Sequence, residues 1–111
     1  MSALRTLVVQ AHVEWNDPAA NRRRISALLE AAEPGFDLAV LPETFTTGFL
    51  GDQGADDEGM DGPTVSWMQA AAEKHRCALS GSVVICENGE RFNRFLFVTA
   101  DGLLAHYDKR H

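Results

Sequence analysis

The sequence predicts an α/β fold in which a mixed sheet is backed by helices, and two stretches of the chain point to it. Residues 4–75 alternate between short apolar runs and longer segments of helical periodicity, as in parallel strands joined by right-handed crossovers. Residues 78–107 contain strand-like runs separated by tight turns, which adds antiparallel strands to the sheet. The hydrophobic share of 45% and the charged share of 23% are ordinary for a globular domain and argue against disorder.

The first strand and the first helix are predicted from the opening third of the chain. Residues 4–9 form a compact apolar run whose two valines favour a strand. Asp17 can cap a helix and Pro18 suits its first position, whereas Pro34 and Gly35 end it. The apolar stripe of this helix repeats at i, i+3, i+4 and i+7, in Ile25, Leu28, Leu29 and Ala32.

A second strand is predicted over residues 36–41, which are nearly continuous in apolar side chains, as in a strand covered on both faces. Pro42 has no N–H to give to a sheet ladder, so the strand should end before it. Glu43 then follows directly beyond the carboxyl end of the strand, where α/β sheets tend to carry chemistry. One glutamate in this place is a weak signal, because most such residues are caps or solvated turns.

A second helix and a longer strand are predicted next. Pro63 and Thr64, after Gly62, have the residue types of a helix start. A strand then runs from Ala78 to Cys86. The inner stripe of the helix is Val65, Met68, Ala72 and His75, so His75 is interpreted as a helix-end residue and not as a ligand.

Two hairpins complete the predicted sheet. Asn88-Gly89 is the strongest short hairpin signal, and it joins the preceding strand to a partner over residues 92–99. Asp101-Gly102 is a second tight turn, after which residues 103–107 return as the last strand. The chain therefore ends on an antiparallel meander.

Charge and hydropathy narrow the function classes. The formal net charge of -6 and the pI of about 5.0 argue against non-specific binding to nucleic acid or to an acidic membrane surface. No apolar run approaches the roughly 18 residues of a membrane helix, and residues 1–5 do not begin a secretory signal. These features favour the cytoplasm.

The two cysteines are predicted to be free thiols. Cys77 and Cys86 flank one strand, which at about 3.3 Å per residue sets them roughly 30 Å apart. A disulfide needs Cα atoms within about 7 Å of each other. Free thiols fit a reducing compartment.

A long acidic connection, residues 46–63, follows Glu43 directly. Its carboxylates lack the alternating register and terminal glutamate of a calcium loop, so neither a metal site nor any other cofactor is predicted. The simplest interpretation is a solvated loop, although connections of this length are often functional.

Two motifs resemble signatures of one enzyme family. Residues 38–49, which read LAVLPETFTTGF, resemble the first signature of the nitrilase (carbon–nitrogen hydrolase) superfamily, and residues 93–111 resemble its second. The resemblance implies the N-terminal half of a four-layer α-β-β-α sandwich, a mixed sheet with helices on one face. Residues 1–111 would then be part of one hydrolase domain whose C-terminal half is absent. The run from Glu43 to Phe49 looks most like omega-amidases, which hydrolyse the terminal amide of short dicarboxylic acid monoamides.

The resemblance also implies a Cys-Glu-Lys mechanism. Glu43 matches the general base, and Lys109 matches the lysine that stabilises the oxyanion. The nucleophilic cysteine of the family lies beyond this lysine, and neither Cys77 nor Cys86 has the expected elbow motif around it. The 111 residues are therefore expected to be inactive alone. Phe45 and Phe49 are candidate substrate-binding residues, although core packing is the better interpretation for at least one of them.

Two alternatives remain open beside the hydrolase. One is a short non-catalytic homologue that uses an exposed apolar sheet face as an interaction module. The other is a small nucleotide-binding domain, which ranks last because residues 10–16 contain no glycine to cradle a phosphate. For the hydrolase, the expected partners are a small amide substrate and, in a full-length form, a second copy in a homodimer. The isolated chain is expected to self-associate through its uncovered sheet face.

Overall fold

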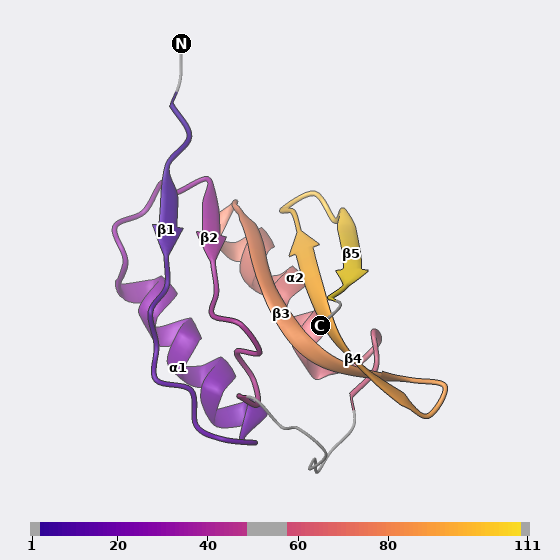
Figure 1. Cartoon of the computed structure of the whole chain (residues 1–111). Helices are drawn as coiled ribbons and strands as arrows, with labels where there is room; N and C mark the ends of the chain where they lie inside the picture. The colour runs from indigo at the N-terminus through magenta and orange to yellow at the C-terminus, as the bar shows by residue number, and fades with distance from the viewer. Residues whose placement is uncertain (1–2, 49–57, 110–111) are drawn as a thin grey trace.

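The computed structural model describes residues 3–48 and 58–109, which form one five-stranded sheet and two helices (Figure 1). The strands lie in the sheet in chain order, β1 to β5. The elements are β1 (Thr6–Val8), α1 (Pro18–Ala31), β2 (Leu38–Val40), α2 (Pro63–His75), β3 (Ala78–Glu87), β4 (Glu90–Val98) and β5 (Leu104–Asp108).

The predicted mixed sheet is confirmed. β1, β2 and β3 pair in parallel, whereas β4 is antiparallel to both β3 and β5. The two helices lie on one face of the sheet (Figure 1). They contact each other there, and Trp67 Nε1 of α2 donates to Ser26 Oγ of α1 at 2.8 Å. An ion pair between Lys74 and Glu30 joins the same two helices. The prediction of helices on one face is therefore confirmed as well.

The first two strands are shorter than the apolar runs that predicted them, at three residues each. At the start of this strand pair, the carboxylate of Asp37 accepts the N–H of Arg5 at 2.8 Å. At the other end Pro42 has no N–H to donate. Ala39 is fully buried, but Leu38 and Val40 on the opposite face are only half-buried, so the expectation of a strand covered on both faces is wrong for the described residues.

Local signals set the ends of the helices, and the start of α1 is as predicted. Asp17 Oδ1 accepts the N–H of Ala20 at 3.2 Å, which caps the start of α1. The first turn of α2 has a cap that sequence reasoning missed, because the carboxylate of Glu58 accepts both the N–H and the hydroxyl of Thr64. Arg76 ends α2 in the left-handed region, at φ 52°.

The Asn-Gly hairpin forms as predicted. Asn88 and Gly89 have φ values of 54° and 79°, which is the pattern of a type I′ turn. The turn brings Glu87 and Glu90 opposite each other at the head of the β3–β4 ladder. The second turn closes through Thr99, whose N–H donates to Leu103 O at 3.0 Å.

The core lies between the helices and one face of the sheet. Side chains at alternate positions of β3 and β4 point into it and are fully buried, together with residues of both helices. On the opposite face no helix among residues 3–48 and 58–109 covers the strands, and Val8 and Tyr107 are 62% and 58% exposed. The core members from β3 and β4 are Leu79, Val83, Ile85, Leu96 and Val98.

None of the described helices is long and apolar enough to cross a membrane.

Candidate active site

Glu43 lies in a tight turn directly after β2. Its neighbour Thr44 has φ 42°, in the left-handed region that a threonine rarely adopts. Ser82 of β3 holds this turn twice, because its Oγ accepts the N–H of Thr44 at 2.8 Å and its carbonyl accepts the N–H of Phe45 at 3.2 Å. Strain of this kind persists only where the surroundings over-determine the conformation, and it is common at functional sites.

Lys109 follows β5 and reaches the Glu43 turn. Its N–H donates to the carbonyl of Asn93 on β4 at 2.8 Å, which continues the β4–β5 ladder by one more bond. Its Nζ lies 3.2 Å from Glu43 Oε1, and the side chains of Lys109 and Glu43 are 26% and 58% exposed. The structure thus brings together the two charged residues that the sequence predicted as catalytic.

The sheet topology accounts for this meeting. β2 and β3 are parallel, and two antiparallel pairings then turn the chain twice, so β5 runs in the same direction as β2. The carboxyl ends of β2 and β5 therefore lie at the same end of the sheet (Figure 1). Residues that follow these two ends can share one site, as at the carboxyl ends of other α/β sheets.

Asn93 is a third side chain at this site. Its Nδ2 donates to Glu43 Oε1 at 3.3 Å, so this oxygen receives both the amide and the Lys109 ammonium. The Oδ1 of the same amide is buried and has no hydrogen-bond partner in the described structure. The sequence contained Asn93 within the second motif, but nothing in the spacing assigned it to Glu43.

A buried arginine fastens the two strands that support Lys109. Arg94, only 3% exposed, donates from Nε and Nη2 to the two carboxylate oxygens of Asp108 at 2.6 and 3.1 Å. Its Nη1 donates to Glu87 Oε2 at 3.0 Å. These hydrogen bonds lower the pKa of Asp108 and of Glu87, and the two carboxylates raise the pKa of Arg94.

Sequence reasoning missed this cluster, although a signal was present. Residues 92, 94 and 96 alternate onto the helix side of β4, so the arginine stands between two apolar positions that face the core. A charged residue in such a position requires partners. The Arg94 guanidinium also lies over the ring of Phe92, 5.3 Å from its centroid.

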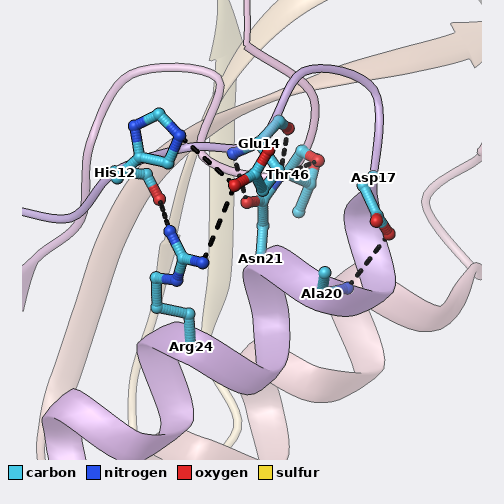
Figure 2. A network of polar contacts seen from close by, with 7 residues as sticks. All are labelled: His12, Glu14, Asp17, Ala20, Asn21, Arg24 and Thr46. Carbon is cyan, nitrogen blue, oxygen red and sulfur yellow. Dashed lines mark hydrogen bonds and ion pairs between the residues drawn. The ribbon is translucent and has the colours of Figure 1, made fainter.

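A second buried polar residue ties the loops around the site (Figure 2). Asn21 of α1 is 1% exposed, and its amide exchanges two hydrogen bonds with the backbone of Glu14, at 2.7 and 2.8 Å. Its Nδ2 also donates to the carbonyl of Thr46 at 2.7 Å. The loop before α1 is thereby fastened to the turn that carries Glu43.

The rim of this network is more exposed. Arg24 donates to the carbonyl of His12 at 2.9 Å and lies 3.8 Å from the carboxylate of Glu14 (Figure 2). His12 Nε2 lies 3.3 Å from the same carboxylate. Exposed pairs of this kind contribute little to stability.

The two phenylalanines have different outcomes. Phe45 is completely buried, with its ring centroid 5.7 Å from that of Trp67, and so packs in the core. Its role in substrate binding stays a prediction. Phe49 lies outside the described residues.

Both cysteines are free thiols. Cys77 is buried directly before β3, at the opposite end of the sheet from Glu43. Burial raises the pKa of the Cys77 thiol, which disfavours the reactive thiolate. Cys86 is half-buried near the end of the same strand.

Within residues 3–48 and 58–109, no three histidine, cysteine or carboxylate side chains are grouped to hold a metal ion. A cavity of about 400 Å³ opens between the starts of α1 and α2, and its lining includes neither Glu43 nor Lys109.

The fold and this pair of strand ends define an α/β protein with a carboxylate–ammonium site, and comparison with known proteins gives its family. Residues 5–111 match the family model described as "Carbon-nitrogen hydrolase", so the chain belongs to the carbon–nitrogen hydrolase family. The predicted resemblance is confirmed at this level.

The similar proteins include omega-amidases and solved structures of the same superfamily. The chain is 37% identical to the omega-amidase YafV of Escherichia coli over all of its 111 residues, and 29% identical to a 2-oxoglutaramate amidase of Bacillus subtilis over 108 residues. It is 44% identical to a CN-hydrolase superfamily protein of Xanthomonas campestris, whose crystal structure has an arsenic adduct in the active site, with a TM-score of 0.88 over the whole chain. The chain spans 43% and 41% of the two amidases and 42% of the crystallised protein.

Proposed function

We propose that this chain supplies the general base and the oxyanion-stabilising cation of an omega-amidase-like carbon–nitrogen hydrolase. The observation that carries the proposal is the 3.2 Å contact between Glu43 Oε1 and Lys109 Nζ, beyond the carboxyl ends of β2 and β5. The substrate would be a small amide, specifically the terminal amide of a short dicarboxylic acid, because the relatives that match the whole chain are named omega-amidases.

The chemistry suits a thiol mechanism. A thiol becomes a good nucleophile once a nearby base has taken its proton, and Glu43 would act as that base. Attack on the amide carbonyl then creates an oxyanion, and a fixed ammonium such as that of Lys109 offsets the new charge in the transition state.

The nucleophile is the component that these residues do not provide. Cys77 is unsuited because it is buried at the far end of the sheet with a raised thiol pKa. We therefore expect no amide turnover by residues 1–111 alone. Cys77- or Cys86-dependent hydrolysis by the isolated chain would contradict this part of the proposal.

The decisive experiment uses a fusion in which residues 1–111 are followed by the C-terminal portion of the Escherichia coli omega-amidase. Release of ammonia from a short dicarboxylic acid monoamide is measured. We expect turnover by the fusion and a loss of roughly 100-fold or more in kcat for Glu43→Gln and for Lys109→Met. The matched control is Glu33→Gln, a carboxylate removed from an exposed position after α1, which should keep full activity. Full activity of the Glu43→Gln fusion would refute the proposal.

One observation favours a second candidate, an interaction module. The sheet face opposite the helices exposes Val8 and Tyr107, and a partner could cover it. The interaction module would be favoured if the fusion folds but hydrolyses no amide and if the 111-residue chain forms a tight homo-oligomer. A homodimeric full-length form, cytoplasmic location and a single larger hydrolase domain that includes residues 1–111 stay predictions.

A further inference from the structure

We propose that Asn93 is a positioning residue that holds Glu43 and Lys109 in their working geometry, an inference that rests on the proposed function. Asn93 contacts both residues at once. Its side-chain Nδ2 donates to Glu43 Oε1 at 3.3 Å, and its main-chain carbonyl accepts the main-chain N–H of Lys109 at 2.8 Å. The Lys109 ammonium contacts the same oxygen of Glu43, at 3.2 Å.

The chemistry of the amide defines its orientation. In the orientation found here, the amide Nδ2 of Asn93 donates a hydrogen bond to the carboxylate of Glu43. If the amide were reversed, its Oδ1 would face that carboxylate, and two acceptor oxygens would repel each other. The observed orientation leaves Oδ1 buried without a partner among the described residues. Because an unpaired buried carbonyl costs free energy, an apolar side chain of the same size would suit the fold better. The contact with Glu43 is therefore a role that an apolar side chain in this position could not fill.

The backbone that carries Asn93 is held from both sides. It pairs with Val84 of β3, and the neighbouring residue Arg94 is fastened to Asp108 of β5. A side chain with two rotatable bonds on such a strand is a short, fixed donor. The lysine side chain has four carbons and is flexible, so it fixes a carboxylate less well. Asn93 would thus limit the positions that the Glu43 carboxylate can take, which is how oriented groups lower an activation barrier.

The contact is tested first in the 111-residue chain itself. The probe is the Asn93 side-chain NH₂ signal in a ¹⁵N-labelled sample. We expect a shift of this signal in Glu43→Ala and none in the control Glu33→Gln. An unchanged Asn93 signal in Glu43→Ala would overturn the proposal whether or not any polypeptide is catalytically active.

The function of the contact is tested in the fusion with Asn93→Leu, which removes the amide and the unpaired Oδ1 with little change in size. We expect kcat to fall roughly 10- to 100-fold with little change in KM. The melting temperature should stay the same or rise, because an unpaired buried acceptor has been removed. The control is Phe97→Leu, on the same face of β4 but opposite Ser80 and Ala105, which should leave kcat unchanged.

The outcomes separate this inference from the proposed function. A purely structural Asn93 predicts a lower melting temperature and an unchanged kcat in Asn93→Leu, and that result would overturn the inference alone. If Glu43→Gln retains full activity, the proposed function fails instead. The NMR measurement decides the contact independently of both.

Discussion

Gly81 of β3 lies directly beneath the turn that carries Glu43, and adding one methyl group there should disturb both packing and catalysis. A Cβ at this position would lie 3.0 Å from Leu41 Cβ and 3.1 Å from Cδ1 and Cε1 of Phe45. Carbon atoms prefer separations of about 3.5–4.0 Å, so these neighbours must recede by roughly half an ångström. Phe45 is completely buried and Leu41 is 5% exposed, so neither has open space to move into.

The expected cost in the free energy of unfolding follows from two opposing terms. Overpacking of a core costs about 1–3 kcal/mol. Replacing a glycine that has no positive φ returns about 0.4–1 kcal/mol, because the unfolded chain loses conformational freedom. We therefore expect Gly81→Ala to destabilise the protein by about 1–2 kcal/mol, or by roughly 2–8 °C in the melting temperature of a protein of the fusion's size.

The effect on activity follows from position in the chain. Leu41 and Phe45 stand two residues before and two residues after Glu43, so a shift of both moves the carboxylate relative to Lys109. Small misplacements of a catalytic group lower kcat strongly. Melting temperature and kcat are measured in the fusion for Gly81→Ala, Phe45→Leu and the double variant.

The double variant provides the critical comparison. Phe45→Leu removes the ring atoms that the new methyl group would meet, so the two substitutions together should cost less than the sum of their separate costs. Additive costs, or a Gly81→Ala protein that melts no lower than the unsubstituted one, would refute the reasoning from close packing.

Three further predictions concern other parts of the molecule. Asn21→Ala should lower the free energy of unfolding by about 2–4 kcal/mol in a urea titration, because it removes three hydrogen bonds, including the one to the buried carbonyl of Thr46. Arg24→Ala on the exposed rim should cost less than about 0.5 kcal/mol, and equal effects of the two substitutions would show that Asn21 does not fasten the loops. Arg94 holds the pKa of both its carboxylate partners below their ordinary values, so their contribution to stability is present near neutral pH and is lost as the pH falls below about 4. The free energy of unfolding that Arg94→Met loses should therefore be smaller at pH 3 than at pH 7. An equal loss at both pH values would argue against this linkage. The isolated chain should self-associate in analytical ultracentrifugation, with Val8→Lys and Tyr107→Lys shifting it toward monomer; a monodisperse monomer would show that the exposed sheet face needs no cover.

The order of the elements and most of their ends could be predicted because the signals are local. Asp17 and Pro18 began a helix, Asn88 and Gly89 made a tight hairpin turn, and both effects act within a few residues. The first two strands were predicted too long, because an apolar run does not reveal that Asp37 takes the N–H of Arg5 in place of a ladder bond.

The sequence by itself determined the α/β class, the strand ends that carry Glu43 and Lys109, and the family to which these motifs belong. Only the tertiary structure decided that the two side chains meet, that Asn93 joins them, and that Phe45 packs in the core. The physical reason is that caps, turns and periodicity act within a few residues. A carboxylate and an ammonium on β2 and β5 meet only after the sheet pairing has been formed, and that pairing depends on contacts between segments far apart in the chain.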